Sequence, residues 1–254
     1  MIALLLLLFV TQDLQGVFNR AVADFENGRF KESAAGFDQL VKAIPERAPY
    51  LWQRGIALYY AGRYDDCRRQ FESHRAVNPN DVENAAWHFL CVARGDSPAK
   101  ARAALLPVGP DARSPMREVY EMFRGTLTPE QVLSAAGTDP EAQFFAHLYL
   151  GLYFEAIGMK PRALEHITIA AADRFARAGG YMHMVARVHL RSLTEPRMRT
   201  LRPCDTRRPS ARARWRQTAS RPGKSRCRQC REPACPGSLP RWPVSAAIRG
   251  MQPR

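Results

Sequence analysis

Residues 54–81 read RGIALYYAGRYDDCRRQFESHRAVNPND, and residues 20–47 read RAVADFENGRFKESAAGFDQLVKAIPER. The two stretches match when one is shifted by 34 residues against the other. The matched pairs are Gly28 and Gly62, Phe30 and Tyr64, Phe37 and Phe71, and Pro45 and Pro79. Because a period of 34 residues is typical of helix–turn–helix units that stack on one another, we predict an all-α chain.

A second spacing pattern recurs inside these units and in a third stretch, residues 148–171, which reads LYLGLYFEAIGMKPRALEHITIAA. A small residue precedes each turn glycine, and a small and then a large apolar residue follow it. The four sets are Ala21, Gly55 and Gly151; Gly28, Gly62 and Gly158; Ser33, Cys67 and Ala163; and Phe37, Phe71 and Ile167. We expect the first set to let the paired helices approach closely, and the turn glycines to adopt left-handed helix ends. Phe30 and Tyr64 are expected to pack back into the helix pair, and Pro45 and Pro79 to stop the second helix. These positions therefore indicate structure and not catalysis.

The three stretches resemble tetratricopeptide repeats. The second stretch is similar to the family pattern at Gly55, Gly62, Tyr64, Phe71 and Pro79, and the third departs from it at Lys160, where an aromatic residue is usual. The resemblance implies a right-handed superhelical solenoid of antiparallel helix pairs. The segments RGIALYY (54–60), PND (79–81) and LGLYFEAIG (150–158) further resemble bacterial envelope lipoproteins of the NlpI type, although the lipid-attachment cysteine of that type is absent.

The predicted domain organisation follows from this pattern. The solenoid covers residues 13–193, with units at about 14–47, 48–81, 82–112, 113–138 and 139–176 and an end helix at 181–192. Within the units we expect helices at about 14–27, 30–44, 48–61, 64–77, 82–94, 98–106, 115–124, 128–136, 140–157 and 160–174. The units at 82–112 and 113–138 are degenerate.

The first residues, MIALLLLLFVTQ, contain nine consecutive apolar positions, 2–10. Such a run is too short to span a bilayer and matches the apolar part of a secretory signal peptide. No Lys or Arg precedes it and no A-x-A site follows it. We expect residues 1–12 to be a signal peptide with a shortened start, and the protein to be exported to the periplasm or cell envelope. The alternatives are a buried first helix and a cytoplasmic protein.

The charge of the chain is concentrated in its last part. The net charge is +14, of which residues 194–254 carry +13 through 15 Arg and 1 Lys against 2 Glu and 1 Asp. The remaining residues are nearly neutral, so the charge does not indicate nucleic-acid binding by the repeat body. The apolar content of 46% and charged content of 24% exclude disorder of the whole chain.

In this family the first helix of each unit lines a concave groove that binds a peptide or protein partner. Carried over by position, the resemblance implies groove residues in the first two units, namely Phe18, Val22, Phe25, Trp52, Ile56, Tyr59 and Tyr60. The alternative is that several of these side chains pack against the next unit. Cys67 and Cys91 are expected to be small buried core residues. No metal-ligand, phosphate-loop or nucleophile motif is present, so we predict a protein that is not an enzyme and needs no cofactor.

Residues 194–254 lose the helical pattern and become rich in Arg, Pro and Cys. Cys204, Cys227, Cys230 and Cys235 are a weak candidate zinc site, and RARWR (212–216) with Trp215 and Trp242 could contact nucleic acid. The abrupt change is also what a frame-shifted or unselected reading would produce, and a disordered basic arm is a third interpretation. Two function hypotheses remain: an interaction module that binds a protein partner in its groove, and a repeat platform whose tail binds nucleic acid or zinc. The pattern predicts neither the partner nor the oligomeric state.

Overall fold

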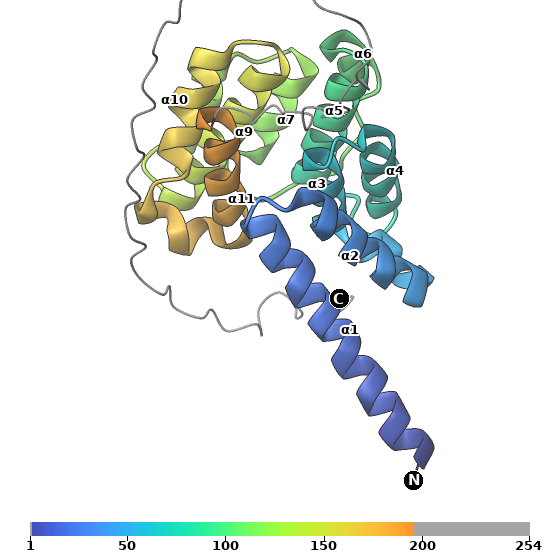
Figure 1. Cartoon of the computed structure of the whole chain (residues 1–254). Helices are drawn as coiled ribbons and strands as arrows, with labels where there is room; N and C mark the ends of the chain where they lie inside the picture. The colour runs from blue at the N-terminus through green and yellow to red at the C-terminus, as the bar shows by residue number, and fades with distance from the viewer. Residues whose placement is uncertain (1, 196–254) are drawn as a thin grey trace, which may run out of the picture. The chain divides into compact units, whose positions relative to one another are not determined.

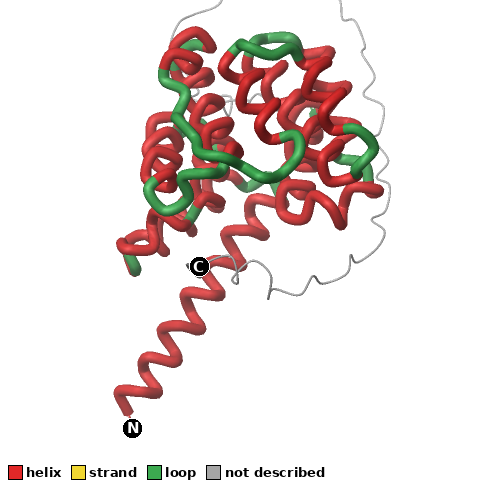
Figure 2. The backbone as a smooth tube through the Cα atoms, turned by 180° about the vertical axis from the view of Figure 1, so that it is seen from behind, coloured by secondary structure: helices red, strands yellow, loops and turns green. Residues whose placement is uncertain are grey.

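The structure is a computed structural model of the whole chain that describes residues 2–195, with side chains from residue 14. Backbone contacts divide the chain into residues 1–197 and 198–254, and every described residue belongs to the first unit. The described part consists of helices and loops and contains no strand, which confirms the all-α prediction for these residues (Figure 2). No helix in residues 2–195 combines the length and the apolar character needed to cross a membrane.

Eleven α-helices and two 3₁₀ helices follow one another in the described part (Figure 1). The first half contains α1 (Ile2–Glu26), α2 (Phe30–Ala43), η1 (Pro45–Tyr50), α3 (Trp52–Tyr60), α4 (Tyr64–Arg75) and α5 (Val82–Gly95). The second half contains α6 (Pro98–Ala103), α7 (Met116–Arg124), α8 (Pro129–Ala136), α9 (Pro140–Ala156), α10 (Lys160–Ala170), η2 (Asp173–Phe175) and α11 (Ala176–Thr194). With the exception of α6 and α7, consecutive α-helices pack side by side, and α1 extends beyond the other helices at its N-terminal end (Figure 1).

The same turn closes the hairpins α1–α2, α3–α4 and α9–α10. In each turn a glycine has positive φ, at 75° in Gly28, 77° in Gly62 and 84° in Gly158. The residue after the glycine donates its N–H five residues back, over 2.8 Å from Arg29 to Asp24, 2.9 Å from Arg63 to Leu58 and 2.8 Å from Met159 to Phe154. This left-handed helix end satisfies carbonyls that the finished helix leaves free, and a glycine adopts it without a steric penalty.

The helices of these hairpins approach most closely where small residues stand. A Cβ atom built on Gly55 would lie 2.6 Å from the ring of Phe71, and one on Gly151 would lie 2.5 Å from Ile167. In the first hairpin the glycine lies on the second helix, and a Cβ on Gly36 would lie 2.9 Å from that of Ala21. The spacing of 16 residues between Gly55 and Phe71 equals that between Gly151 and Ile167, so two distant hairpins pack by the same contact.

Several boundaries differ from the sequence-based ranges. The helix expected to start at 48 starts at Trp52, because residues 45–50 form a 3₁₀ helix that contains Pro49, which has no N–H to donate. The helix expected at 98–106 ends at Ala103, and the helix expected to reach 174 ends at Ala170. The last helix starts at Ala176, five residues earlier than expected, and is kinked at Gly180, where φ is 49°.

Candidate functional site

The seven predicted groove residues lie on one side of α1 and α3, but most of them are buried. Phe25 and Ile56 are fully buried, and Phe18 and Tyr59 are nearly so. Val22, Trp52 and Tyr60 are half-buried. The structure therefore brings the predicted residues together, with only these last three retaining exposed surface.

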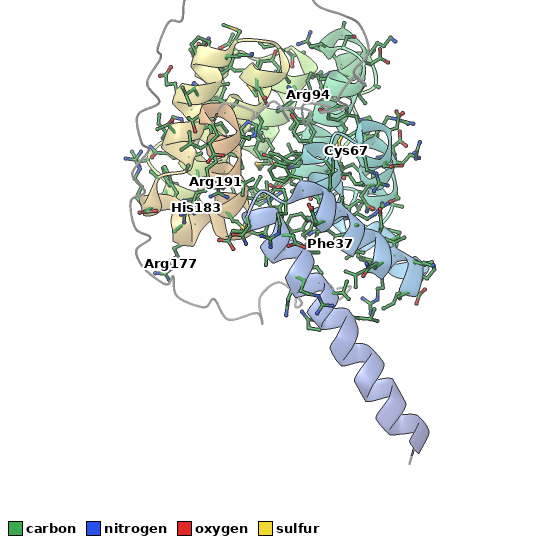
Figure 3. The ribbon with its side chains drawn as sticks, viewed as in Figure 1. Phe37, Cys67, Arg94, Arg177, His183 and Arg191 are labelled. Carbon is green, nitrogen blue, oxygen red and sulfur yellow. A yellow bond between two sulfur atoms is a disulfide. The ribbon has the colours of Figure 1, made fainter. Side chains whose placement is uncertain are left out.

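The last helix, α11, covers this side of α1 and α3. The ring of Tyr181 meets that of Trp52 edge to face at 4.9 Å, and the ring of His189 meets that of Tyr60 at 5.8 Å. Arg191 donates a hydrogen bond to the carbonyl of Glu26 at the end of α1 (Figure 3). This carbonyl belongs to the negative end of the α1 dipole, which favours a cation there. The concave side that the sequence predicts is thus occupied by a segment of the same chain.

Beneath α11 the aromatic rings of several units meet around Tyr60. Its ring lies 5.2 Å from that of Phe25, 5.0 Å from Phe30 and 5.3 Å from Tyr59. Trp87 of α5 lies 5.5 Å from Tyr59, so the cluster continues into the third hairpin. Edge-to-face pairs of this kind add to the stabilisation that burial alone provides.

A polar group lies inside this aromatic cluster. Tyr60 Oη lies 2.8 Å from His189 Nδ1, and His189 Nε2 lies 3.3 Å from a carboxylate oxygen of Glu155. The other Glu155 oxygen lies 3.4 Å from Arg94. These residues come from α3, α11, α9 and α5, so four helices contribute to one buried network that we call the Tyr60–His189–Glu155 network.

The protonation states of this network follow from its burial. Burial lowers the pKa of His189, an effect that the carboxylate of Glu155 partly opposes, while burial raises the pKa of Tyr60. At neutral pH the imidazole is therefore uncharged and the phenol keeps its proton. Tyr60 then donates to Nδ1 of His189, and the ring proton sits on Nε2, which faces Glu155.

The groove residues predicted from the sequence do not include His189, Glu155, Arg94 or Tyr181. A signal for one of them was present, since Glu155 follows Gly151 by four residues, as Tyr59 follows Gly55 and Phe25 follows Ala21. The residues at this matching position of three units therefore all face the buried side of their hairpins. No comparable pattern marks His189 or Tyr181, because α11 does not repeat any other helix.

A second polar cluster joins the start of α5 to the loop before α7. Arg113 contacts the carboxylates of Asp81 at 2.8 Å, Glu83 at 2.5 Å and Asp111 at 2.7 Å, and Glu83 also accepts from Tyr149 over 2.5 Å. A polar pocket beside this cluster is lined by Asn78, Asn80, Pro110 and Ala112. A single guanidinium contacts all three carboxylates, so the cluster ties the start of α5 to the loop before α7.

Two histidines of the last hairpin pair directly. His147 Nδ1 lies 3.0 Å from His166 Nδ1, and the ring of His166 stacks on that of Phe154 at 5.5 Å. Burial lowers the pKa of His147 to about 4, with His166 adding to the effect. Within residues 2–195, no three His, Cys, Asp or Glu side chains are grouped so as to hold a metal ion.

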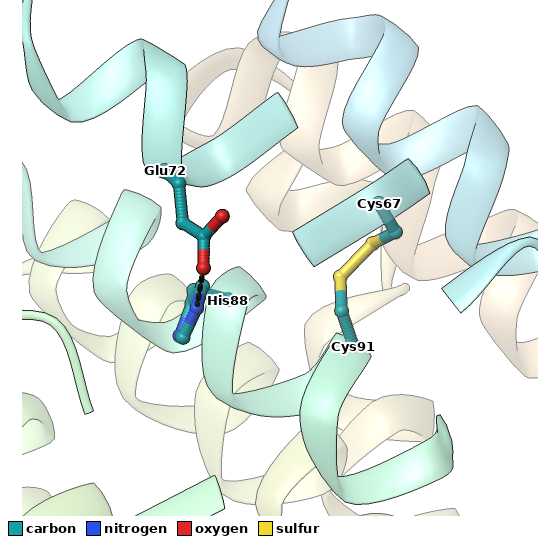
Figure 4. Close-up of a disulfide and its surroundings, with 4 residues drawn as sticks. All are labelled: Cys67, Glu72, His88 and Cys91. Atoms are coloured by element: carbon teal, nitrogen blue, oxygen red, sulfur yellow. Dashed lines mark ion pairs between the residues drawn. A yellow bond between two sulfur atoms is a disulfide. The ribbon is translucent and has the colours of Figure 1, made fainter. Parts of the chain in front are cut away.

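The two cysteines of the described part are more than small core residues. Cys67 of α4 and Cys91 of α5 are buried, as expected, but their sulfur atoms are bonded to each other (Figure 4). The expectation did not include this bond. A spacing of 24 residues in the sequence does not give the distance between the two sulfur atoms, which depends on the packing of α4 against α5. The candidate zinc ligands Cys204, Cys227, Cys230 and Cys235, and Trp215 and Trp242, lie outside the described residues.

No protein-family model matches the chain.

Proposed function

We propose that this protein is a non-enzymatic interaction module of the tetratricopeptide type, built as a right-handed superhelical solenoid. Three hairpins with the same glycine turn, two of which share the same helix-crossing contact, support this proposal. Repeated units of this kind create an extended surface on which a protein or peptide can bind. The packing of helices in antiparallel pairs agrees with a binding role.

The partner-binding face in this proposal is the part of the concave side that α11 leaves uncovered. Trp52 at the start of α3 is the proposed anchor, because this large aromatic side chain remains partly exposed although its ring meets Tyr181 of α11. Val22 on α1 is half-buried on the same predicted face, and Ile56 and Tyr59 support it from below. Partly exposed aromatic side chains on a rigid surface are frequent energetic anchors of protein interfaces.

Site-specific photocrosslinking tests this face directly. A photoreactive phenylalanine analogue replaces Trp52 in one variant and Arg69, which is exposed on α4, in a control variant. After irradiation of cells that produce the protein, we expect one discrete adduct from position 52 and none from position 69. Adducts of equal intensity from both positions, or from position 69 alone, would place the partner on another surface.

We propose that the protein acts outside the cytoplasm, at the cell envelope. The apolar run at residues 2–10 and the resemblance to envelope proteins support this location. Cell fractionation followed by mass analysis of the N-terminal peptide is the test. Recovery in the envelope or periplasmic fraction is the expected result, and recovery with cytoplasmic markers alone would contradict it.

A further inference from the structure

The disulfide joins successive hairpins and not the two helices of one hairpin. Cys67 lies in α4, which closes the second hairpin, and Cys91 lies in α5, which opens the third, with Cα atoms 5.8 Å apart. The bond therefore fixes the stacking of two units. A solenoid depends on such contacts between neighbours, because one unit alone cannot bury its apolar faces.

Both cysteines are closed off from solvent in the folded chain. The exposed fraction is 0% for Cys67 and 1% for Cys91. Thiol–disulfide exchange requires a thiolate to approach one sulfur of the bond directly. Since no reagent reaches these sulfurs once α4 and α5 are fully packed, the bond must form before this packing is complete.

From this arrangement we infer that Cys67 and Cys91 are the substrate thiols of a disulfide-donating protein, which acts on the chain during folding in an oxidising compartment. The thiolate of one cysteine attacks the donor's disulfide, forms a mixed disulfide and releases the donor's other sulfur as a thiolate. The thiolate of the second cysteine then attacks the mixed disulfide, and the donor leaves as a dithiol. Each cysteine loses one proton, and the two electrons pass to the donor.

The bond is then a permanent staple and not a redox switch. A switch needs a sulfur that a reductant can reach in the folded state, and neither sulfur meets this condition. The inference also gives a chemical reason for export, since such bonds persist outside the cytoplasm and are rare inside it. It does not rest on partner binding, so its test uses no binding measurement.

Peptide mapping of the full chain, purified from its own cells after acid quenching and alkylation of free thiols in denaturant near neutral pH, is the first test. Trypsin releases Tyr64–Arg68 and Ala76–Arg94, each with one cysteine. In wild-type cells the expected product is the linked pair of peptides, lighter by two hydrogens than the two peptides together. In cells that lack the disulfide donor this linked pair should be lost. Two alkylated peptides from wild-type cells would overturn the inference.

Reduction kinetics provide the second test. Dithiothreitol should break the bond in the folded protein at least about 100-fold more slowly than in urea, because opening of the packed helices must come first. Equal rates would show accessible sulfurs and refute the order of events that we infer.

Thermal unfolding of a variant that lacks the disulfide is the third test. Removing the staple should lower the Tm by roughly 8 °C, since the bond restricts the unfolded chain. The Cys67→Ala plus Cys91→Ala variant should unfold at the same temperature with and without reductant. Wild type refolded in reductant should unfold at the lower temperature of this variant. An unchanged Tm in reduced, refolded wild type would contradict the staple.

Discussion

Tyr60 Oη and His189 Nδ1 lie 2.8 Å apart although the two residues are 129 positions apart in the sequence. Trp52 and its ring partner Tyr181 are separated by the same number of positions. Each pair is spaced eight residues from the other on both helices, about two turns of α-helix. The helices α3 and α11 therefore run in the same direction and contact each other through two matched pairs of rings. This registration brings the end of the described chain onto the face of the first two hairpins.

Removal of the Tyr60 hydroxyl tests the energetic weight of this contact. Tyr60→Phe leaves Nδ1 of the buried His189 without its donor, so we expect a loss of about 1–3 kcal/mol in the free energy of unfolding. Urea denaturation followed by circular dichroism measures it. Tyr50→Phe, at the end of η1, should change stability by less than about 0.5 kcal/mol, and equal effects at both positions would show that the hydrogen bond has no special role.

Gly55 should not tolerate even one added methyl group. Its Cβ would lie 2.6 Å from the ring of Phe71, so Gly55→Ala is expected to cost about 1–3 kcal/mol through overpacking. Gly16 is the control, because a Cβ there would meet only the flexible side chain of Arg20 within α1. Gly16→Ala should be neutral or stabilise by up to about 1 kcal/mol, since alanine favours helix. A stable Gly55→Ala variant would contradict the crossing contact.

Arg113 should be among the most sensitive charged residues. Arg113→Ala leaves Asp81, Glu83 and Asp111 facing one another without their counter-ion. We expect a loss of about 2–4 kcal/mol, reduced from the value for a fully buried pair because the guanidinium is 37% exposed. Arg162→Ala removes an ion pair with the exposed Glu130 and a contact with the ring of Phe154, and it should cost clearly less than Arg113→Ala. A similar loss at both sites would refute a special role for the Arg113 cluster.

The stability of the protein should fall as the pH drops below about 6.5. Burial lowers the pKa of His88, His147, His166 and His189, so the unfolded chain binds protons that the folded chain excludes. The stabilisation is complete above the unfolded pKa and is lost toward the lower folded values, at up to about 1.4 kcal/mol per pH unit for each such histidine. Urea titrations at pH 7.5, 6.0 and 5.0 measure the trend. In His147→Gln the slope should be smaller, and a stability that rises toward pH 5 would contradict the assigned directions.

The sequence predicted the local structure far better than the closure of the fold. Turn glycines mark three of the hairpins, and small residues mark their helix crossings, because these units solve the same packing problem with the same residue types. The contact between α11 and α3 has no such signature, since His189 and Tyr181 belong to a helix that occurs once. The same limit applies to Cys67 and Cys91, whose pairing depends on two helices from different units lying side by side.

The affinity of the photocrosslinked partner for wild-type protein and for Trp52→Ala tests the central claim most directly. Isothermal titration should show at least a tenfold weaker Kd for Trp52→Ala, the effect of removing an aromatic anchor, while Arg69→Ala binds as wild type does. Circular dichroism of both variants must match wild type. Unchanged affinity in a folded Trp52→Ala variant would contradict partner binding at the concave face of α1 and α3.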